Sequence, residues 1–199
     1  MTNRLTIFEI EHDLAENGFQ TIALDGDDSY ARPYVSLMAD PNTVRDRWIA
    51  PGVCVDRPTL QQPDFFHLWG GLAFVLGTTV PEDVRETLRI SGELLPVMLD
   101  GVELEYLHVT HVCNVVDKSQ TEWDDEEDET SDALAFFVHR LPAVPLFRVP
   151  ENNASQLFCS QGYGEFDFKS LVEARGLTGL LFREAWNTDA GPIRKVWRW

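Results

Sequence analysis

Alternating apolar and polar residues give the clearest signal around Asp100-Gly101, the dipeptide that a two-residue type I′ turn prefers. Every second residue from Val102 to Tyr106 is apolar and the two between are glutamates, whereas further along both parities are apolar. We therefore predict a hairpin of Leu94–Leu99 and Val102–Asp117, whose second strand runs into a sheet covered on both faces. Pro96 cannot donate a backbone hydrogen bond, which favours an edge or bulged position for the first strand.

Shorter runs of the same character surround this hairpin. They combine apolar, β-branched and aromatic residues and are bounded by glycine, proline or aspartate, which is typical of strands. The predicted strands are Arg4–Glu11, Phe19–Leu24, Val53–Asp56, Leu72–Leu76, Ala133–Arg140, Pro145–Val149, Ser155–Ser160 and Leu177–Glu184.

One helix is predicted over Pro81–Ser91. Thr79–Glu82 has the form of a capping box, with the proline early in the first turn, and Gly92 suits the left-handed position that ends many helices. By contrast, Asp25–Ser29 has the composition of a turn, and the pattern over Tyr30–Ala50 is weaker, with one helical turn expected after Pro41.

A second helix is predicted between the last two strands. Asp167 can cap a helix that continues to Arg175, and Gly176 would end it. The order strand, helix, strand from Ser155 to Glu184 permits a right-handed parallel crossover.

These elements predict a single domain over Met1–Trp199, of α/β or α+β class, with a mixed, mainly antiparallel sheet, the hairpin at its centre and a few short helices. A chain of 199 residues with 44% hydrophobic residues can bury a substantial core, and we find no internal repeat and no linker that would divide it. Residues 1–50 form the least regular part, and residues 118–132 form an acidic loop.

The strongly acidic composition of the chain makes some classes of binding partner less suitable than others. The formal net charge is −17, from 33 acidic and 16 basic residues. Such a charge repels nucleic acids and anionic lipid surfaces and speeds encounter with basic protein surfaces, although it also serves solubility alone. The acids at Glu9, Glu11 and Asp13 do not fit a signal peptide, and no apolar run has the length of a membrane span. We therefore expect a cytoplasmic protein that binds neither nucleic acid nor membrane.

No motif in the sequence indicates catalysis, a metal or a cofactor. His108 and His111 would face opposite sides of a strand, so they cannot converge on one ion there. The cysteines Cys54, Cys113 and Cys159 lie far apart, which is typical of free thiols in a reducing compartment. We expect no cofactor, no metal and no enzymatic activity, but catalytic groups scattered along the chain would leave no pattern.

The strongest electrostatic feature is Glu122–Asp132, with eight carboxylates in eleven residues. Mutual repulsion and the lack of apolar periodicity predict a solvated loop. An aromatic residue among charges also suits protein recognition, because aromatic anchors hold a partner that the charges steer. The candidate partner-binding residues are Trp123, Asp124, Asp125, Glu126, Glu127, Asp128 and Glu129.

Several short motifs resemble a known family in their order along the chain. They are Pro51-Gly52-Val53, Pro63-Asp64-Phe65-Phe66, the helix near residue 85, Leu95-Pro96-Val97, Tyr106-Leu107-His108-Val109, Val116-Asp117 with Ser119, and Gly176-Leu177-Thr178-Gly179-Leu180-Leu181-Phe182. Over roughly Pro51–Glu184 the chain resembles bacterial polymorphic-toxin immunity proteins of the Imm-eleven type. The resemblance implies a cytoplasmic protein encoded beside a toxin, which it binds and neutralises. It supplies no catalytic residues.

Three hypotheses follow. The first is an immunity protein that blocks the active site or substrate groove of a cognate toxin, with acidic residues facing a basic surface. The second is an enzyme or effector-associated domain, which a deep pocket holding a residue with a strongly shifted pKa would favour. The third is a general protein-binding module or homo-oligomeric scaffold, which a large self-complementary apolar face would support.

Overall fold

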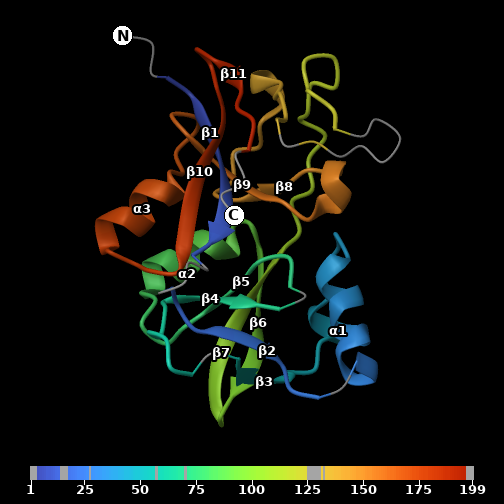
Figure 1. Cartoon of the computed structure of the whole chain (residues 1–199), viewed down its shortest axis with the longest axis vertical. Helices are drawn as coiled ribbons and strands as arrows, with labels where there is room; N and C mark the ends of the chain where they lie inside the picture. Colours follow the sequence, from blue (N-terminus) through green and yellow to red (C-terminus); the bar gives the residue numbers. More distant parts are fainter. Residues whose placement is uncertain are drawn as a thin grey trace.

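The strands of the chain divide into two sheets, as the computed structural model shows (Figure 1). The structure describes residues 4–13, 18–26, 28–56, 58–69, 71–124, 131 and 133–195. The first sheet has five strands in the order β11-β10-β1-β9-β8, and all its neighbouring strands are antiparallel. Their bounds are β1 Thr6–His12, β8 Phe147–Arg148, β9 Leu157–Gln161, β10 Leu180–Asn187 and β11 Gly191–Pro192.

The second sheet is a closed six-stranded barrel in the order β2-β3-β6-β7-β5-β4. Two neighbouring pairs, β2 with β4 and β3 with β6, are parallel, and the others are antiparallel. The bounds are β2 Thr21–Leu24, β3 Gly52–Val55, β4 Phe65–Leu68, β5 Phe74–Leu76, β6 Gly92–Leu99 and β7 Val102–Val109. The prediction of an α/β or α+β class with mainly antiparallel pairing is confirmed, and the class is α+β. The division into a sheet and a barrel is not visible in the alternation pattern.

The hairpin at Asp100-Gly101 is confirmed. Strands β6 and β7 pair along their whole lengths, and both turn residues have positive φ, 50° and 82°, as a type I′ turn requires. The second strand is shorter than predicted, since it ends at Val109 and the chain then leaves the barrel. Pro96 lies outside the short part of β6 that pairs with β3, and its carbonyl accepts a hydrogen bond from Trp48 Nε1 at 2.8 Å.

Both predicted helices are present, but the helix predicted over Pro81–Ser91 is shorter in the structure. Helix α2 spans Glu82–Arg89 and buries Val84 and Leu88. The predicted capping box is wrong, because the helix begins after Pro81 and the hydroxyl of Thr79 donates instead to Asp64 Oδ1 at 2.5 Å. Gly92 is the first residue of β6 and not a left-handed helix end.

Helix α3 spans Phe168–Arg175 and matches its prediction. Asp167 Oδ1 accepts from the Ser170 backbone N–H at 3.0 Å, and Gly176 has φ of 63°. The strands on either side of this helix are both antiparallel to β1 and therefore parallel to each other, with β1 between them.

Helix α1, Asp28–Ala39, is a finding that the sequence did not predict. It occupies part of the predicted turn at Asp25–Ser29 and contains Pro33, which removes one backbone hydrogen bond. Its apolar stripe is weak, since Met38 is its one fully buried side chain in the described part. The expected helical turn after Pro41 is confirmed as the 3₁₀ turn η1, Arg45–Arg47.

The predicted strand at Ala133–Arg140 is wrong. That segment makes isolated bridges at Ala133 and Phe136 and ends in the 3₁₀ turn η2, Val138–Arg140. A further 3₁₀ turn, η3, spans Glu151–Ala154 between β8 and β9. None of the helices in the described part of the chain has the length and hydropathy of a membrane span.

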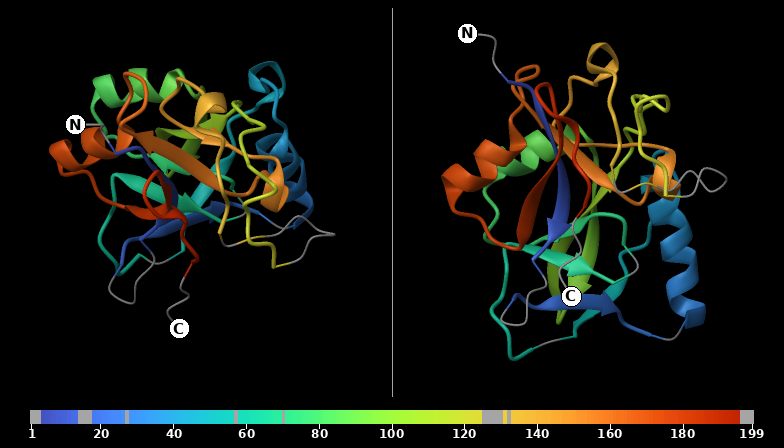
Figure 2. Two further views of the ribbon diagram at one scale, coloured as in Figure 1. Left: turned by 90° about the horizontal axis from the view of Figure 1, so that it is seen from above. Right: turned by 45° about the horizontal axis from the view of Figure 1, so that its top comes forward.

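Apolar side chains cover both faces of the five-stranded sheet. On one face, Phe8 and Ile10 of β1 join the aromatic core that fills the barrel and the contact with α3. On the other face, Ile7 packs with a second cluster contributed mainly by the long segment between β7 and β9. Views from above and from a tilted angle show this segment lying across the sheet (Figure 2). The barrel and the sheet therefore share a core, and the acidic loop belongs to the segment that covers the outer face.

Candidate functional site

The two ends of the acidic loop are held together by hydrogen bonds. Glu122 N donates to Ala133 O at 3.3 Å in an antiparallel bridge. The Ser131 hydroxyl donates to Glu122 O at 2.5 Å and accepts from Ala133 N at 3.0 Å. Five of the seven predicted partner-binding residues, Asp125–Glu129, lie outside the described residues. The structure thus defines where the loop starts and returns.

Trp123 and Asp124 are the two predicted residues that the structure places. Trp123 is half-buried, and its indole Nε1 donates to Lys118 O at 3.2 Å. Asp124 is exposed and lies 3.3 Å from the guanidinium of Arg194, which also contacts Glu122 at 3.3 Å. Exposed pairs of this kind contribute at most about 1 kcal/mol. The indole therefore rests against the base of the loop, while the Asp124 carboxylate forms a partly exposed ion pair with Arg194.

The side chain of Asn152, which lies in η3, is hydrogen-bonded to the end of the acidic loop at Ser131. Its Oδ1 accepts from Ser131 N at 2.8 Å and its Nδ2 donates to Ser131 O at 2.8 Å, so one side chain pairs with a backbone as a strand would. Asn152, Asn153 and Ala154 all have φ between 52° and 55°. Each such residue costs about 1–2 kcal/mol unless its side chain compensates, as asparagine often does. The turn is therefore a strained connection that the Asn152 contacts hold.

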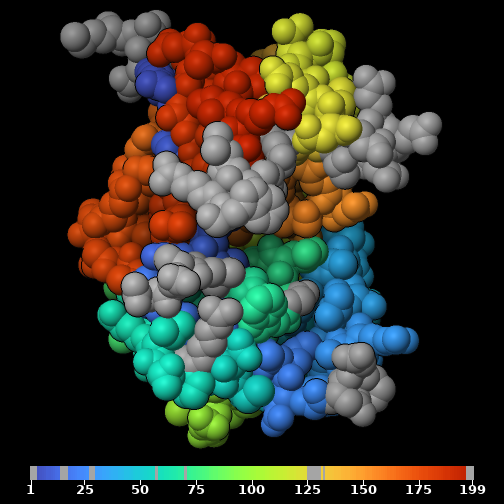
Figure 3. Space-filling model, viewed as in Figure 1, coloured from blue at the N-terminus to red at the C-terminus, as the bar shows by residue number. Residues whose placement is uncertain are grey.

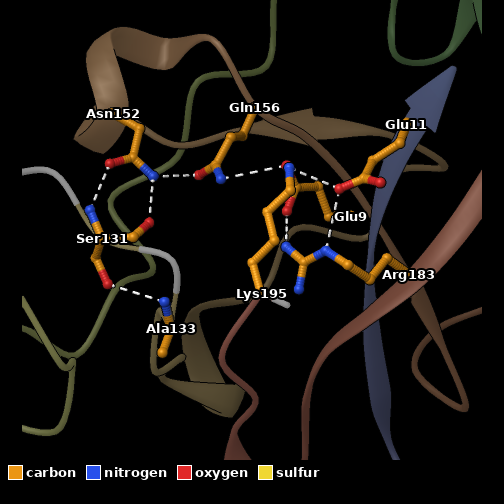
Figure 4. A network of polar contacts seen from close by, with 8 residues as sticks. All are labelled: Glu9, Glu11, Ser131, Ala133, Asn152, Gln156, Arg183 and Lys195. Atoms are coloured by element: carbon orange, nitrogen blue, oxygen red, sulfur yellow. Dashed lines mark hydrogen bonds and ion pairs between the residues drawn. The ribbon is translucent and has the colours of Figure 1, made fainter. Parts of the chain in front are cut away.

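A partly buried ionic cluster continues this network to the sheet (Figure 4). Asn152 Nδ2 donates to Gln156 Oε1 at 2.5 Å, and Gln156 Nε2 donates to Glu9 Oε1 at 3.2 Å. Glu9 is only 4% exposed and accepts from the guanidinium of Arg183, and Lys195 Nζ lies 3.5 Å away. The same two cations also contact Glu11, at 3.1 and 2.7 Å. Two carboxylates and two cations balance in charge, so burial of the cluster leaves no net charge.

The two asparagines of η3 offer a matched pair of substitutions. Asn152→Gly should lower the free energy of unfolding by about 1–3 kcal/mol, because it removes the two side-chain hydrogen bonds to the buried Ser131 backbone. Asn153→Gly should be neutral or stabilise by up to about 1 kcal/mol, because the exposed Asn153 has the same positive φ, which glycine adopts without strain. Urea unfolding of both variants gives the comparison. Equal stabilities would contradict the anchoring role of Asn152.

A second feature is a cavity of about 190 Å³ where the sheet meets the barrel. It is lined by Glu9, His12, His67, Gln156 and apolar side chains from β1, β5 and the start of β9. The imidazoles of His12 and His67 lie 4.3 Å apart between ring centroids, and Nδ1 of each is buried with no hydrogen-bond partner.

Both imidazoles are held neutral. Burial, and secondly the neighbouring His67, lower the pKa of His12 from 6.5 to about 3, and burial lowers the pKa of His67. Sequence reasoning missed this pair because His12 ends a strand of the sheet and His67 lies in the barrel. Only the packing of the two sheets against each other brings them together.

The histidines and cysteines considered from the sequence lie apart. His108 Nε2 is 2.9 Å from Asn42 O, and His111 Nδ1 is 3.0 Å from Ser91 O, so each ring contacts a different backbone carbonyl. Cys159 is buried, and burial raises the pKa of its thiol, whereas Cys54 is exposed. Within the described ranges, no group of three or more His, Cys, Asp or Glu side chains is arranged to hold a metal ion.

Comparison with family models, with curated proteins and with solved structures finds no match to this chain. Two features of the structure are candidates for function, the acidic loop on its fixed base and the cavity lined by His12 and His67.

Proposed function

We propose that this chain is an immunity protein that binds a cognate bacterial toxin and neutralises it by covering its active site or substrate groove. The observation that supports this most is an anionic loop whose two ends are paired with each other, with the Ser131 end linked through Asn152 and Gln156 to a partly buried, charge-balanced cluster. The resemblance of the sequence motifs to immunity proteins supports the same function.

A fixed loop base lowers the entropic cost of binding a partner. A loop with free ends loses conformational entropy when a partner orders it, and that loss weakens binding. Here the bridge of Glu122 with Ala133 and the contacts of Asn152 already fix the base. Carboxylates gathered on such a base attract a basic protein surface and raise the association rate. Toxins that cleave nucleic acids have basic grooves, so they fit this surface.

Neutralising the loop tests this proposal. The variant replaces Asp124, Asp125, Glu126, Glu127, Asp128 and Glu129 with Asn or Gln, and the control makes the same change at the exposed residues Glu82, Glu86, Asp100, Glu103, Glu165 and Glu173. At low salt, we expect the association rate constant of the loop variant with the toxin encoded beside this gene to be lower than that of wild type by a factor of about ten or more. The difference should shrink at about 1 M salt, where the screening length is about 3 Å.

The control separates local from global charge. Both variants lose the same formal charge, so equal slowing would assign the effect to the net charge of −17 and remove the loop from the interface. Stopped-flow mixing at several salt concentrations measures these rates.

The cavity lined by His12 and His67 favours a second candidate, an enzyme or small-ligand-binding domain. A neutral imidazole with an unpaired ring nitrogen can accept a proton, although a pKa of about 3 makes His12 a weak base near neutral pH. Protection that is lost in a His12→Leu, His67→Leu variant that still binds the toxin would favour this candidate. Retained protection would favour neutralisation by binding.

A further inference from the structure

An apolar groove is lined by side chains of α1 and by residues of and just after η1. Its described lining is Tyr30, Pro33, Tyr34, Leu37, Arg47 and Ile49, and its volume is about 300 Å³. Ile49 is 76% exposed and Tyr30 is 38% exposed. A cluster of large exposed apolar side chains is typical of an interaction site, whereas single ones are not informative.

The groove carries no net charge among the residues described. Arg47 is the one charged residue of its described lining, and its guanidinium donates to Asp40 Oδ2 at 2.6 Å. This contact is the main reason why the pKa of Asp40 is lowered. In a chain of net charge −17, a neutral apolar groove is a place where a partner can dock without burying an unpaired charge.

The wall of the groove is supported by a series of aromatic rings that reaches the core. Ring centroids are 5.4 Å apart for Tyr30 and Tyr34, 5.5 Å for Tyr34 and Trp48, and 5.9 Å for Trp48 and Tyr106. Trp48 and Tyr106 are buried, and the Trp48 indole is hydrogen-bonded to Pro96 O. The groove is therefore pre-organised, so a ligand need not order it on binding.

Helix α1 and the segment that carries the base of the acidic loop lie on the same side of the molecule in Figure 1 and in both views of Figure 2. The space-filling view shows the surfaces of α1, in blue, and of residues 115–124, in yellow, along one edge (Figure 3). One partner can therefore face both features.

We infer that this groove is the apolar anchor point of the toxin interface, an inference that rests on the proposed function. The partner surface that fits has a protruding aromatic or aliphatic side chain flanked by lysines or arginines. The apolar side chain enters the groove, and the flanking basic residues complement the net charge of −17 of this chain. In such interfaces apolar anchors set the lifetime of the complex, whereas peripheral charges set the rate of encounter.

This division of roles gives a sharp test. Ile49→Ser and Tyr30→Ala change exposed side chains, so folding should be retained. The matched control is Val102→Ser, at a 50% exposed side chain on the hairpin end. The probe is the isolated toxic domain encoded beside this gene. The dissociation rate constants of the two groove variants should rise about tenfold or more at all salt concentrations, and their association rate constants should change little. The control should match the wild type.

The outcomes separate this inference from the proposed function. If wild type binds the toxic domain and both groove variants dissociate at its rate, the groove is not the anchor, and the proposed function stands. If wild type itself does not bind, both are overturned. Light scattering of wild type and of Ile49→Ser tests whether the groove instead binds a second copy of this chain. If wild type is a dimer and Ile49→Ser is a monomer, the groove is a dimer interface and the inference is overturned.

Discussion

Gly92→Ala should lower the free energy of unfolding by about 3 kcal/mol or more, the cost expected when a well-packed backbone has to move. A Cβ at this position would lie 2.0 Å from the carbonyl oxygen of His108 and 2.9 Å from its carbon. Neither atom belongs to a flexible side chain, so the first pair of the β6–β7 hairpin, Gly92 with Val109, would have to separate. Urea unfolding followed by tryptophan fluorescence measures the loss.

Gly164→Ala is the control for this substitution. Gly164 has a φ of 70°, and an added Cβ there has no atom within 4 Å. Only the left-handed backbone opposes alanine, which costs about 1–2 kcal/mol. If the two variants were equally stable, the close approach of Gly92 to the neighbouring strand would be contradicted.

Acidification should destabilise the protein through His12. The folded pKa of His12 is about 3 and the unfolded value is 6.5, so the unfolded chain takes up the proton first. The stabilising contribution is complete above pH 6.5 and is lost as the pH falls from 6.5 towards 3. Between about pH 7 and about pH 4 this contribution should fall by about 2–3 kcal/mol.

The His12 contribution is measured as a difference, because many carboxylates titrate in the same range. The stability of His12→Leu should fall less steeply with acidification than that of wild type, and a variant of the exposed His139, His139→Gln, should follow wild type. Chemical unfolding at a series of pH values gives the three slopes. Parallel curves for wild type and His12→Leu would show that His12 is not held neutral.

Local rules predicted the elements whose signals are local. The hairpin follows from the two turn residues Asp100 and Gly101, and α3 follows from a capping aspartate and a terminal glycine. Helix α1 was missed because Pro33 lies inside it and because it buries little apolar surface. Alternation indicates which face of a strand is buried but not its partner, so the separation of β1 and β2 into different sheets could not be predicted.

The acidic loop could be located from composition, but its support could not. Ser131 and Asn152 meet because η3 adopts an uncommon left-handed turn, and no residue pattern specifies that contact. The groove on α1 depends on a helix that the sequence did not reveal, and the cavity depends on His12 and His67 meeting across two sheets. Interactions between segments distant in sequence thus explain why the support of the loop and the cavity were missed, whereas the groove was missed together with α1.

If this chain is an immunity protein, it protects a cell by binding a toxin. The test is growth of bacteria that express a candidate toxic domain encoded beside this gene, with and without this chain. We predict that the wild-type chain restores growth and that a chain combining the loop neutralisation with Ile49→Ser protects less at equal expression. Continued growth arrest with the folded wild-type chain present in excess would contradict an immunity function.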